Sequence, residues 1–233
     1  MDAIAHRERL ARIETYFDRT AVQAWAQMTS NAPLGRIRRT VRAGRDAMRA
    51  AILERLPDDL TGARLLDAGC GTGALSVEAA RRGASIVAID LSPKLVALAQ
   101  ERAPRNLGRG SIDYRVGDLL DPALGSFDHV VAMDVLIHYP VDEAAASLAL
   151  LAGRTRQSLL FTFAPSTPVL AAMHAVGRLF PRGDRSPAIQ PMVAGHLRRA
   201  LAAPATLQPF ELRAGPRVTS GFYISELAEL ARR

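Results

Sequence analysis

The segment Leu65-Leu66-Asp67-Ala68-Gly69-Cys70-Gly71-Thr72-Gly73-Ala74 decides the fold of this chain. The apolar run at residues 63–68 predicts a buried strand, and residues 73–82 predict a helix. Three glycines between them permit a tight turn and let the backbone approach a ligand without Cβ clashes. They also expose amide N–H groups at the start of a helix. The segment therefore predicts a strand–turn–helix unit with a ligand-binding turn.

The alternation of strand and helix continues downstream of this turn. Further strands are predicted at residues 85–90, 112–116, 127–133 and 158–163, and helices at residues 92–103 and 142–152. Ser92 is the expected N-cap of the first of these helices, with Pro93 at its first position. Short apolar strands separated by helices of 10 to 15 residues are typical of a parallel sheet covered on both faces.

Less regular segments flank this alternating region. Helical spacing of apolar residues appears at residues 5–30, 34–56 and 192–202, with an apolar stripe from Val169 to Phe180, and two final strands are predicted at 207–213 and 218–224. We expect an α/β fold with a doubly wound, mostly parallel seven-stranded sheet, an N-terminal helical extension and a helical lid after the fifth strand. The expected division is a cap (1–57), a ligand-binding core (58–165), a lid (166–203) and C-terminal strands (204–233).

Acidic residues at the strand ends indicate which class of ligand the turn binds. Asp90 ends the second strand, 21 positions after Gly69, where a carboxylate can accept hydrogen bonds from a ribose diol. Asp118 follows the third strand, where an acid can accept a hydrogen bond from an adenine amino group. As G-x-G-x-x-A the turn is a dinucleotide fingerprint. As G-x-G-x-G preceded by Asp67, it suits a smaller ligand with a cationic amino-acid tail.

The second interpretation is favoured over the dinucleotide. Cys70 and Thr72 are small enough for the turn to pack beside a compact ligand, and the chain has no Tyr-x-x-x-Lys pair for hydride chemistry. A turn that merely links strand to helix would leave three glycines and three strand-end acids unexplained. The runs LLDAGCGTGALS, VAID and VGDLL resemble the class I S-adenosylmethionine-dependent methyltransferases. This resemblance implies S-adenosylmethionine as cofactor, held by Asp67, Gly69, Cys70, Gly71, Gly73, Asp90, Leu91, Asp118, Leu119 and Asp134.

Segments across nearly the whole chain are also similar to the magnesium-protoporphyrin IX methyltransferases of chlorophyll and bacteriochlorophyll synthesis. The similar segments are Tyr16-Phe17-Asp18-x-Thr20 with Trp25, Arg42-x-Gly44, DVLIHYP at 134–140, FAPSTP at 163–168, GRLFP at 177–181 and FYIS at 222–225. Two positions depart from the family pattern. Met28-Thr29 stands where many relatives carry a tyrosine, and Ser166 replaces a common lysine.

The resemblance implies methyl transfer to a propionate carboxylate of the porphyrin, which gives an ester. A carboxylic acid is already ionised at neutral pH, so alignment of oxygen, methyl and sulfur matters more than a strong base. His138 is expected to orient the carboxylate, accept a proton or contact the magnesium. Tyr16, the only phenol left on its segment, is the second catalytic candidate. The expected substrate-binding residues are Phe17, Trp25, Met173 and Arg42, the last beside the other propionate; ordinary packing is the alternative for the apolar ones.

Other functions are compatible with the same core. A methyltransferase of another small acceptor, such as a quinone precursor, would share the glycine turn. A non-catalytic nucleotide-binding module would not require His138 beside that turn. A nucleic-acid methyltransferase is disfavoured, because no D/N-P-P-Y/F follows the fourth strand and only 5% of residues are aromatic for base stacking.

The amino-acid composition limits which kinds of protein this chain can be and where it can act. The 233 residues are 48% apolar, which excludes a wholly disordered chain, and the single cysteine excludes an internal disulfide or a cysteine-based zinc cage. Net charge is +7, and residues 33–55 hold seven arginines against two acidic residues. No apolar run reaches membrane-spanning length, and the N-terminus lacks a signal-peptide core. We expect a cytoplasmic protein that binds no nucleic acid and touches the photosynthetic membrane peripherally. The family resemblance implies substrate delivery by the magnesium-chelatase large subunit.

Overall fold

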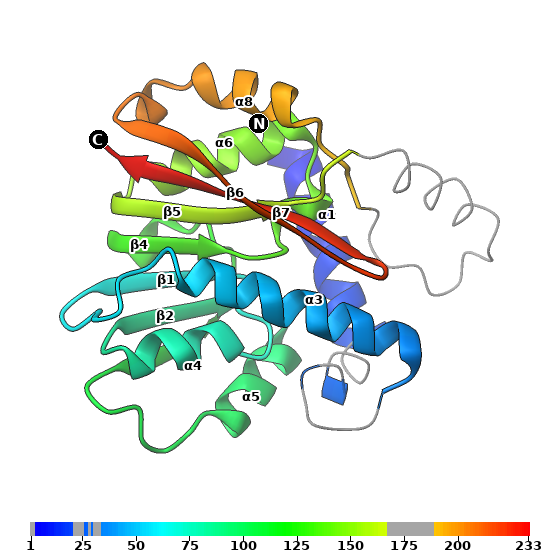
Figure 1. Cartoon of the computed structure of the whole chain (residues 1–233), viewed down its shortest axis with the longest axis vertical. Helices are drawn as coiled ribbons and strands as arrows, with labels where there is room; N and C mark the ends of the chain where they lie inside the picture. Colours follow the sequence, from blue (N-terminus) through cyan, green and yellow to red (C-terminus); the bar gives the residue numbers. More distant parts are fainter. Residues whose placement is uncertain (1–2, 21–25, 28, 30–33, 167–188) are drawn as a thin grey trace.

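A seven-stranded sheet forms the centre of the computed structural model, which describes residues 3–20, 26, 27, 29, 34–166 and 189–233 (Figure 1). The strands are β1 (Arg64–Ala68), β2 (Ser85–Asp90), β3 (Ser111–Val116), β4 (Phe127–Ala132), β5 (Thr155–Phe163), β6 (Phe210–Ser220) and β7 (Tyr223–Arg232). Their order is β3-β2-β1-β4-β5-β7-β6. The first five run parallel, and β7 is antiparallel to both of its neighbours. The predicted mostly parallel, doubly wound sheet is confirmed.

Helices cover both faces of the sheet. Near the viewer in Figure 1 lie α3 (Arg36–Leu53), α4 (Ala74–Arg81) and α5 (Pro93–Arg102), and behind the sheet lie α1 (Ala3–Thr15) and α6 (Val141–Ala152), with α8 (Ala194–Ala202) beside α6. Short helical turns occupy Tyr16–Thr20, Pro122–Leu124, Leu136–His138 and Ala205–Leu207. As expected, Ser92 caps α5: its side chain accepts a hydrogen bond from the Leu95 N–H at 3.2 Å. Of the helix predicted over residues 5–30, the described part is α-helical up to Thr15, a π-helical turn over Tyr16–Thr20, and helical again at Ala26 and Gln27.

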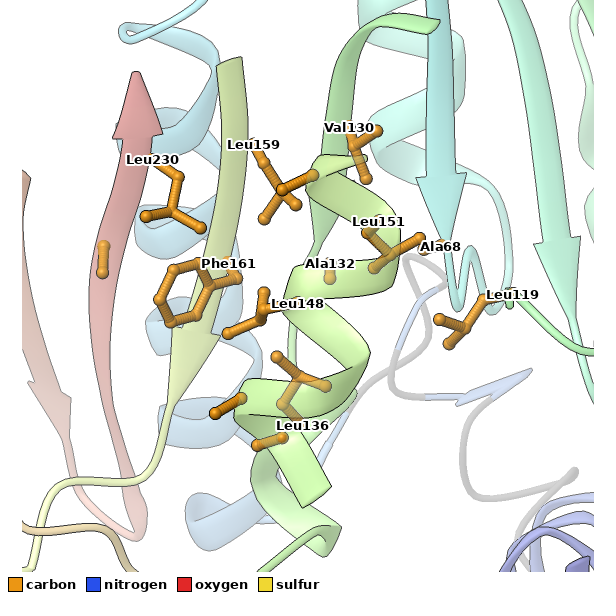
Figure 2. Close-up of a cluster of buried hydrophobic side chains, with 14 of the residues drawn as sticks. Ala68, Leu119, Val130, Ala132, Leu136, Leu148, Leu151, Leu159, Phe161 and Leu230 are labelled. Atoms are coloured by element: carbon orange, nitrogen blue, oxygen red, sulfur yellow. The ribbon is translucent and has the colours of Figure 1, made fainter. Parts of the chain in front are cut away.

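The core lies where α6 packs on the middle of the sheet (Figure 2). Leu148 and Leu151 of α6 are fully buried against Leu159 and Phe161 of β5 and Val130 of β4. Both faces of the sheet are buried, so its central strands are apolar without alternation, as a parallel sheet requires. This packing fixes the carboxyl ends of β1, β2 and β4 side by side.

The two predicted C-terminal strands are present, but their bounds differ from the predicted 207–213 and 218–224. The structure has a long hairpin, β6 and β7, whose turn contains Gly221 with φ of 59°. Gly215 and Pro216 lie at an irregularity in the β6–β7 pairing, between Ala214 and Arg217. Because β6 is an edge strand, a proline there removes no ladder hydrogen bond that the sheet needs. The last residues are a strand because β7 pairs with β5, a contact that local spacing does not reveal.

Two further expectations concern membranes and the lid. Within the described residues, no helix is both long and apolar enough to cross a bilayer. The apolar stripe from Val169 to Phe180, which includes Met173, lies outside the described residues, as do Trp25 and Met28.

Candidate active site

The glycine turn joins β1 to α4 and takes a shape that only glycine adopts easily. Gly69, Gly71 and Gly73 have φ of 79°, 53° and 76°, in the left-handed region that side chains disfavour. The N–H groups of Gly69 and Cys70 both donate to the Ile89 carbonyl, at 2.8 and 3.0 Å. A Cβ at Gly69 would collide with Val135, whereas nothing lies within 4 Å of a Cβ at Gly71. The turn is therefore held against Ile89 and Val135 on one side and is open at Gly71 on the other. A ligand can approach the backbone on the open side.

A buried carboxylate, Asp67, and a half-buried one, Asp90, flank this turn. The Ser76 hydroxyl donates to Asp67 Oδ2 at 2.5 Å, yet burial, with the nearby charge of Asp90, raises the pKa of Asp67 to about 6. Asp90 accepts hydrogen bonds from the N–H groups of Gly71 and Ser92, both at 2.9 Å. Burial nevertheless raises the pKa of Asp90 above its ordinary value. Both groups are thus placed where a cationic or hydroxylated ligand would stabilise their charge.

Two adjoining cavities open over the carboxyl ends of the strands. The larger, about 400 Å³, joins the glycine turn and Asp90 to a mainly apolar wall. Of the predicted site residues, it is lined by Tyr16, Phe17, Gly69, Gly71, Asp90, Leu91, Leu119, Asp134 and His138. The smaller, about 250 Å³, is lined on one side by the turn and on the other by arginines. Its predicted members are Arg42, Asp67, Gly69, Cys70 and Gly71. Ligands of open α/β sheets bind at this edge.

His138 is fixed in the wall of the larger cavity. It ends the helical turn Leu136–His138 and is 7% exposed. The Phe17 ring packs edge-on against its imidazole, with ring centroids 6.1 Å apart. Arg9 donates to the His138 carbonyl at 3.4 Å and forms a 3.0 Å ion pair with Glu143 of α6. The N-terminal segment therefore brings Phe17 to the same cavity as the histidine.

Three predicted residues take positions that the sequence did not specify. Gly73 is the N-cap of α4, and a Cβ there would lie 2.9 Å from the Tyr114 hydroxyl. Asp118 accepts a hydrogen bond from the Leu120 N–H at 2.9 Å and is not among the residues lining either described cavity. Arg42 donates to the Gln27 carbonyl at 2.7 Å and faces the smaller cavity, on the cofactor side of the site.

Sequence reasoning missed a polar cluster around Asp134. Arg45 forms a 2.7 Å ion pair with this carboxylate, and the Tyr223 hydroxyl donates to it at 3.0 Å. Burial, followed by the charge of Asp134, raises the pKa of Tyr223 far above its ordinary value, so its hydroxyl remains a donor. Arg45 is one of seven arginines in its segment, and no local signal distinguishes it. Met133, which lines both cavities, was also missed.

Known proteins match both halves of the chain. Residues 65–157 match a methyltransferase domain family, and residues 132–232 match the family described as the magnesium-protoporphyrin IX methyltransferase C-terminus. The magnesium-protoporphyrin O-methyltransferase of Rhodobacter capsulatus is 50% identical over 94% of both chains. The chloroplastic magnesium protoporphyrin IX methyltransferase of Arabidopsis thaliana is 30% identical over 93% of this chain and 69% of its own.

A solved structure shares the whole architecture. The magnesium protoporphyrin IX methyltransferase of Synechocystis with bound SAH has a TM-score of 0.80 and 29% identity, covering 96% of this chain and 99% of its own. Ubiquinone biosynthesis O-methyltransferases of Xanthomonas oryzae are 39% identical, but over only 54% of this chain. Similarity over almost the full length, together with the glycine turn and the His138 cavity, shows that the chain belongs to the magnesium-protoporphyrin O-methyltransferase family.

Proposed function

We propose that the protein transfers a methyl group from S-adenosylmethionine to a propionate carboxylate of magnesium-protoporphyrin IX and forms the monomethyl ester. One observation carries the proposal: a single cavity connects the glycine turn and Asp90 to an apolar wall that contains His138. A methyl donor and a large apolar acceptor can therefore meet in one space. The R. capsulatus relative, with its name and 50% identity, supports the same acceptor.

The residues around the glycine turn fit the cofactor. When bound, S-adenosylmethionine supplies an electrophilic methyl group on a sulfonium centre. We assign the backbone of Gly69, Cys70 and Gly71 to its amino-acid tail, with Asp67 beside the ammonium group. Asp90 would accept hydrogen bonds from the ribose hydroxyls, because it lies at the end of β2, beside the open side of Gly71. We assign Gly73 to shaping the turn and Leu91, Asp118 and Leu119 to the adenine ring.

On the acceptor side of the cavity, aligning the reacting atoms matters more for methyl transfer than a strong general base does. A propionate is ionised at neutral pH, so its oxygen is already a nucleophile. Holding oxygen, methyl and sulfur in line can supply about 7–11 kcal/mol of the barrier. We assign His138 to orienting the carboxylate or collecting a proton, and Tyr16, which lines the same cavity, to the same step. Phe17 would contact the macrocycle, since its ring already packs on His138 and faces the cavity. Trp25 and Met173 remain proposed contacts of the same kind.

The test is methyl transfer to defined acceptors. Labelled S-adenosylmethionine with magnesium-protoporphyrin IX should give labelled monomethyl ester, and binding should shift the porphyrin Soret band. His138→Ala should lower kcat by about 100-fold or more while the KM for S-adenosylmethionine changes less than about threefold. Unchanged turnover would exclude the role of His138. Transfer to a catechol quinone precursor but not to the porphyrin would favour the alternative small acceptor.

We further propose that the protein is cytoplasmic with peripheral membrane contact, and that it receives substrate from the magnesium-chelatase large subunit. Membrane contact is supported by α3, where Ile37 is 59% exposed between the exposed arginines Arg36 and Arg38. Flotation with vesicles containing anionic lipid, compared with neutral vesicles, tests the first idea. Saturable binding to the purified chelatase subunit tests the second. We also keep the division into a cap (1–57), a core (58–165), a lid (166–203) and C-terminal strands (204–233).

A further inference from the structure

Asp134 stands out because its backbone takes a conformation that residues other than glycine rarely adopt. Its φ is 57°, the only positive value for a non-glycine residue in the described part of the chain. Such a conformation is strained and persists only where surrounding contacts enforce it. Here the Asp134 N–H donates to Thr162 Oγ1 at 2.7 Å, which ties the end of β4 to β5. The strain turns the Asp134 carboxylate toward α3 and β7.

The carboxylate of Asp134 is surrounded by donors of the protein itself. Arg45 donates to Oδ2 at 2.7 Å, and Tyr223 and Thr162 donate to Oδ1 at 3.0 and 3.2 Å. A carboxylate has about four acceptor positions, so these bonds use most of them. Its side chain is only 7% exposed. Asp134 is therefore better placed to hold Arg45 than to bind a ligand directly.

Arg45 lies where the two cavities meet. It lines both of them, as do Gly69, Gly71 and Met133. Its rotation about α3 is set by the neighbouring Gly44, because a Cβ there would lie 2.5 Å from Cδ1 of Tyr223. Because residue 44 is glycine, α3 can pack directly against the Tyr223 ring. The next residue along α3, Arg45, then reaches Asp134.

We propose that Arg45 binds the carboxylate that accepts the methyl group, and that Asp134, with Tyr223, is the positioning residue that aims Arg45 at it. This inference rests on the proposed function. A guanidinium held at the junction can donate to one carboxylate oxygen and leave the other free to attack the methyl carbon. In that step an O–CH₃ bond forms, the S–CH₃ bond breaks, and its electron pair stays on sulfur. The ester product has lost its charge, so its hydrogen bond to Arg45 is weaker and release is favoured.

The experiment compares Arg45→Gln, Asp134→Asn, the double variant and the control Arg39→Gln. Arg39 is exposed on the same helix and lines neither described cavity. Each variant is assayed for kcat/KM with magnesium-protoporphyrin IX and for binding of that diacid and its dimethyl ester. Affinity for S-adenosylhomocysteine, measured by calorimetry, reports whether the cofactor site is intact.

We expect Arg45→Gln to lower kcat/KM by about 10- to 100-fold, as loss of a charge-assisted hydrogen bond does. It should also remove about a tenfold preference for the diacid over the dimethyl ester, with S-adenosylhomocysteine affinity changed less than about threefold. Asp134→Asn should lower kcat by about tenfold, and the double variant should be no worse than Arg45→Gln. Retained acid preference in Arg45→Gln, or multiplying effects in the double variant, would overturn the inference. If the wild type methylates no magnesium porphyrin, the proposed function itself fails.

Discussion

Asp67, which we propose to lie beside the ammonium group of the cofactor, should make cofactor binding dependent on pH. Its pKa is raised from 3.8 to about 6, mainly by burial, so its charged form is destabilised by about 3 kcal/mol at neutral pH. In the free protein the group is protonated below pH 6 and ionised above it. An ammonium group of the cofactor beside Asp67 favours the ionised form, so binding below pH 6 releases a proton from this carboxyl.

The sign of the effect follows from that proton release. Affinity should be highest above pH 6 and fall by about tenfold for each pH unit below it. Calorimetry with S-adenosylhomocysteine between pH 5.0 and 7.5, in buffers of different ionisation enthalpy, measures both the affinity and the released protons. Asp67→Asn should reduce the slope of log affinity against pH by about one, even if burial of Asp90 contributes a slope of its own.

A matched control separates this effect from general charge. Asp113 of β3 has a side chain 56% exposed and pairs with Arg115 at 2.7 Å, away from both cavities. Asp113→Asn should leave the slope unchanged. An affinity independent of pH in the wild-type protein, or an unaltered slope in Asp67→Asn, would refute the assignment of Asp67 to the ammonium group.

Four further predictions concern stability. Gly44→Ala should lower the free energy of unfolding by about 1–3 kcal/mol in urea, because the Tyr223 ring occupies the space of the new methyl group. The same change at Gly195 of α8, where nothing lies within 4 Å, should instead raise that free energy by about 0.5–1 kcal/mol. Leu148→Ala should lower it by about 2–5 kcal/mol, because the side chain is fully buried between α6 and the sheet. Burial lowers the pKa of His129 below 6.5, so the unfolded chain takes up more protons than the folded one below that pH. Stability should therefore fall as pH drops below 6.5, and His129→Gln should flatten that part of the profile; an identical profile would contradict it.

The cofactor half of the site was predictable because its rules are local. Glycine is the residue that most readily adopts a positive φ, so glycines such as Gly69 and Gly71 indicate a turn of this kind from the sequence alone. Asp90 ends a strand, and the carboxyl ends of adjacent parallel strands meet at one edge. The spacing of these residues along the chain therefore carries most of the information about that side of the site.

The acceptor half could not be assigned residue by residue. Arg42, a predicted porphyrin contact, lines the smaller cavity, and Arg45, three positions later, lines both cavities, so which of them the porphyrin meets stays a prediction. The helical pattern of α3 predicts a helix without predicting its rotation. That rotation depends on the contact between Gly44 and Tyr223, which are far apart in the sequence.

The sequence by itself determined the architecture and the kind of ligand, because strand and helix periods, the glycine turn and the strand-end acids are written within short stretches. Only the tertiary structure decided which side chains meet. The β7 strand exists because β5 offers it a pairing edge, and that pairing carries Tyr223 to Asp134. Asp134 in turn holds Arg45 between the two cavities. Contacts between residues so distant along the chain depend on packing, and packing leaves no periodic signal in the sequence.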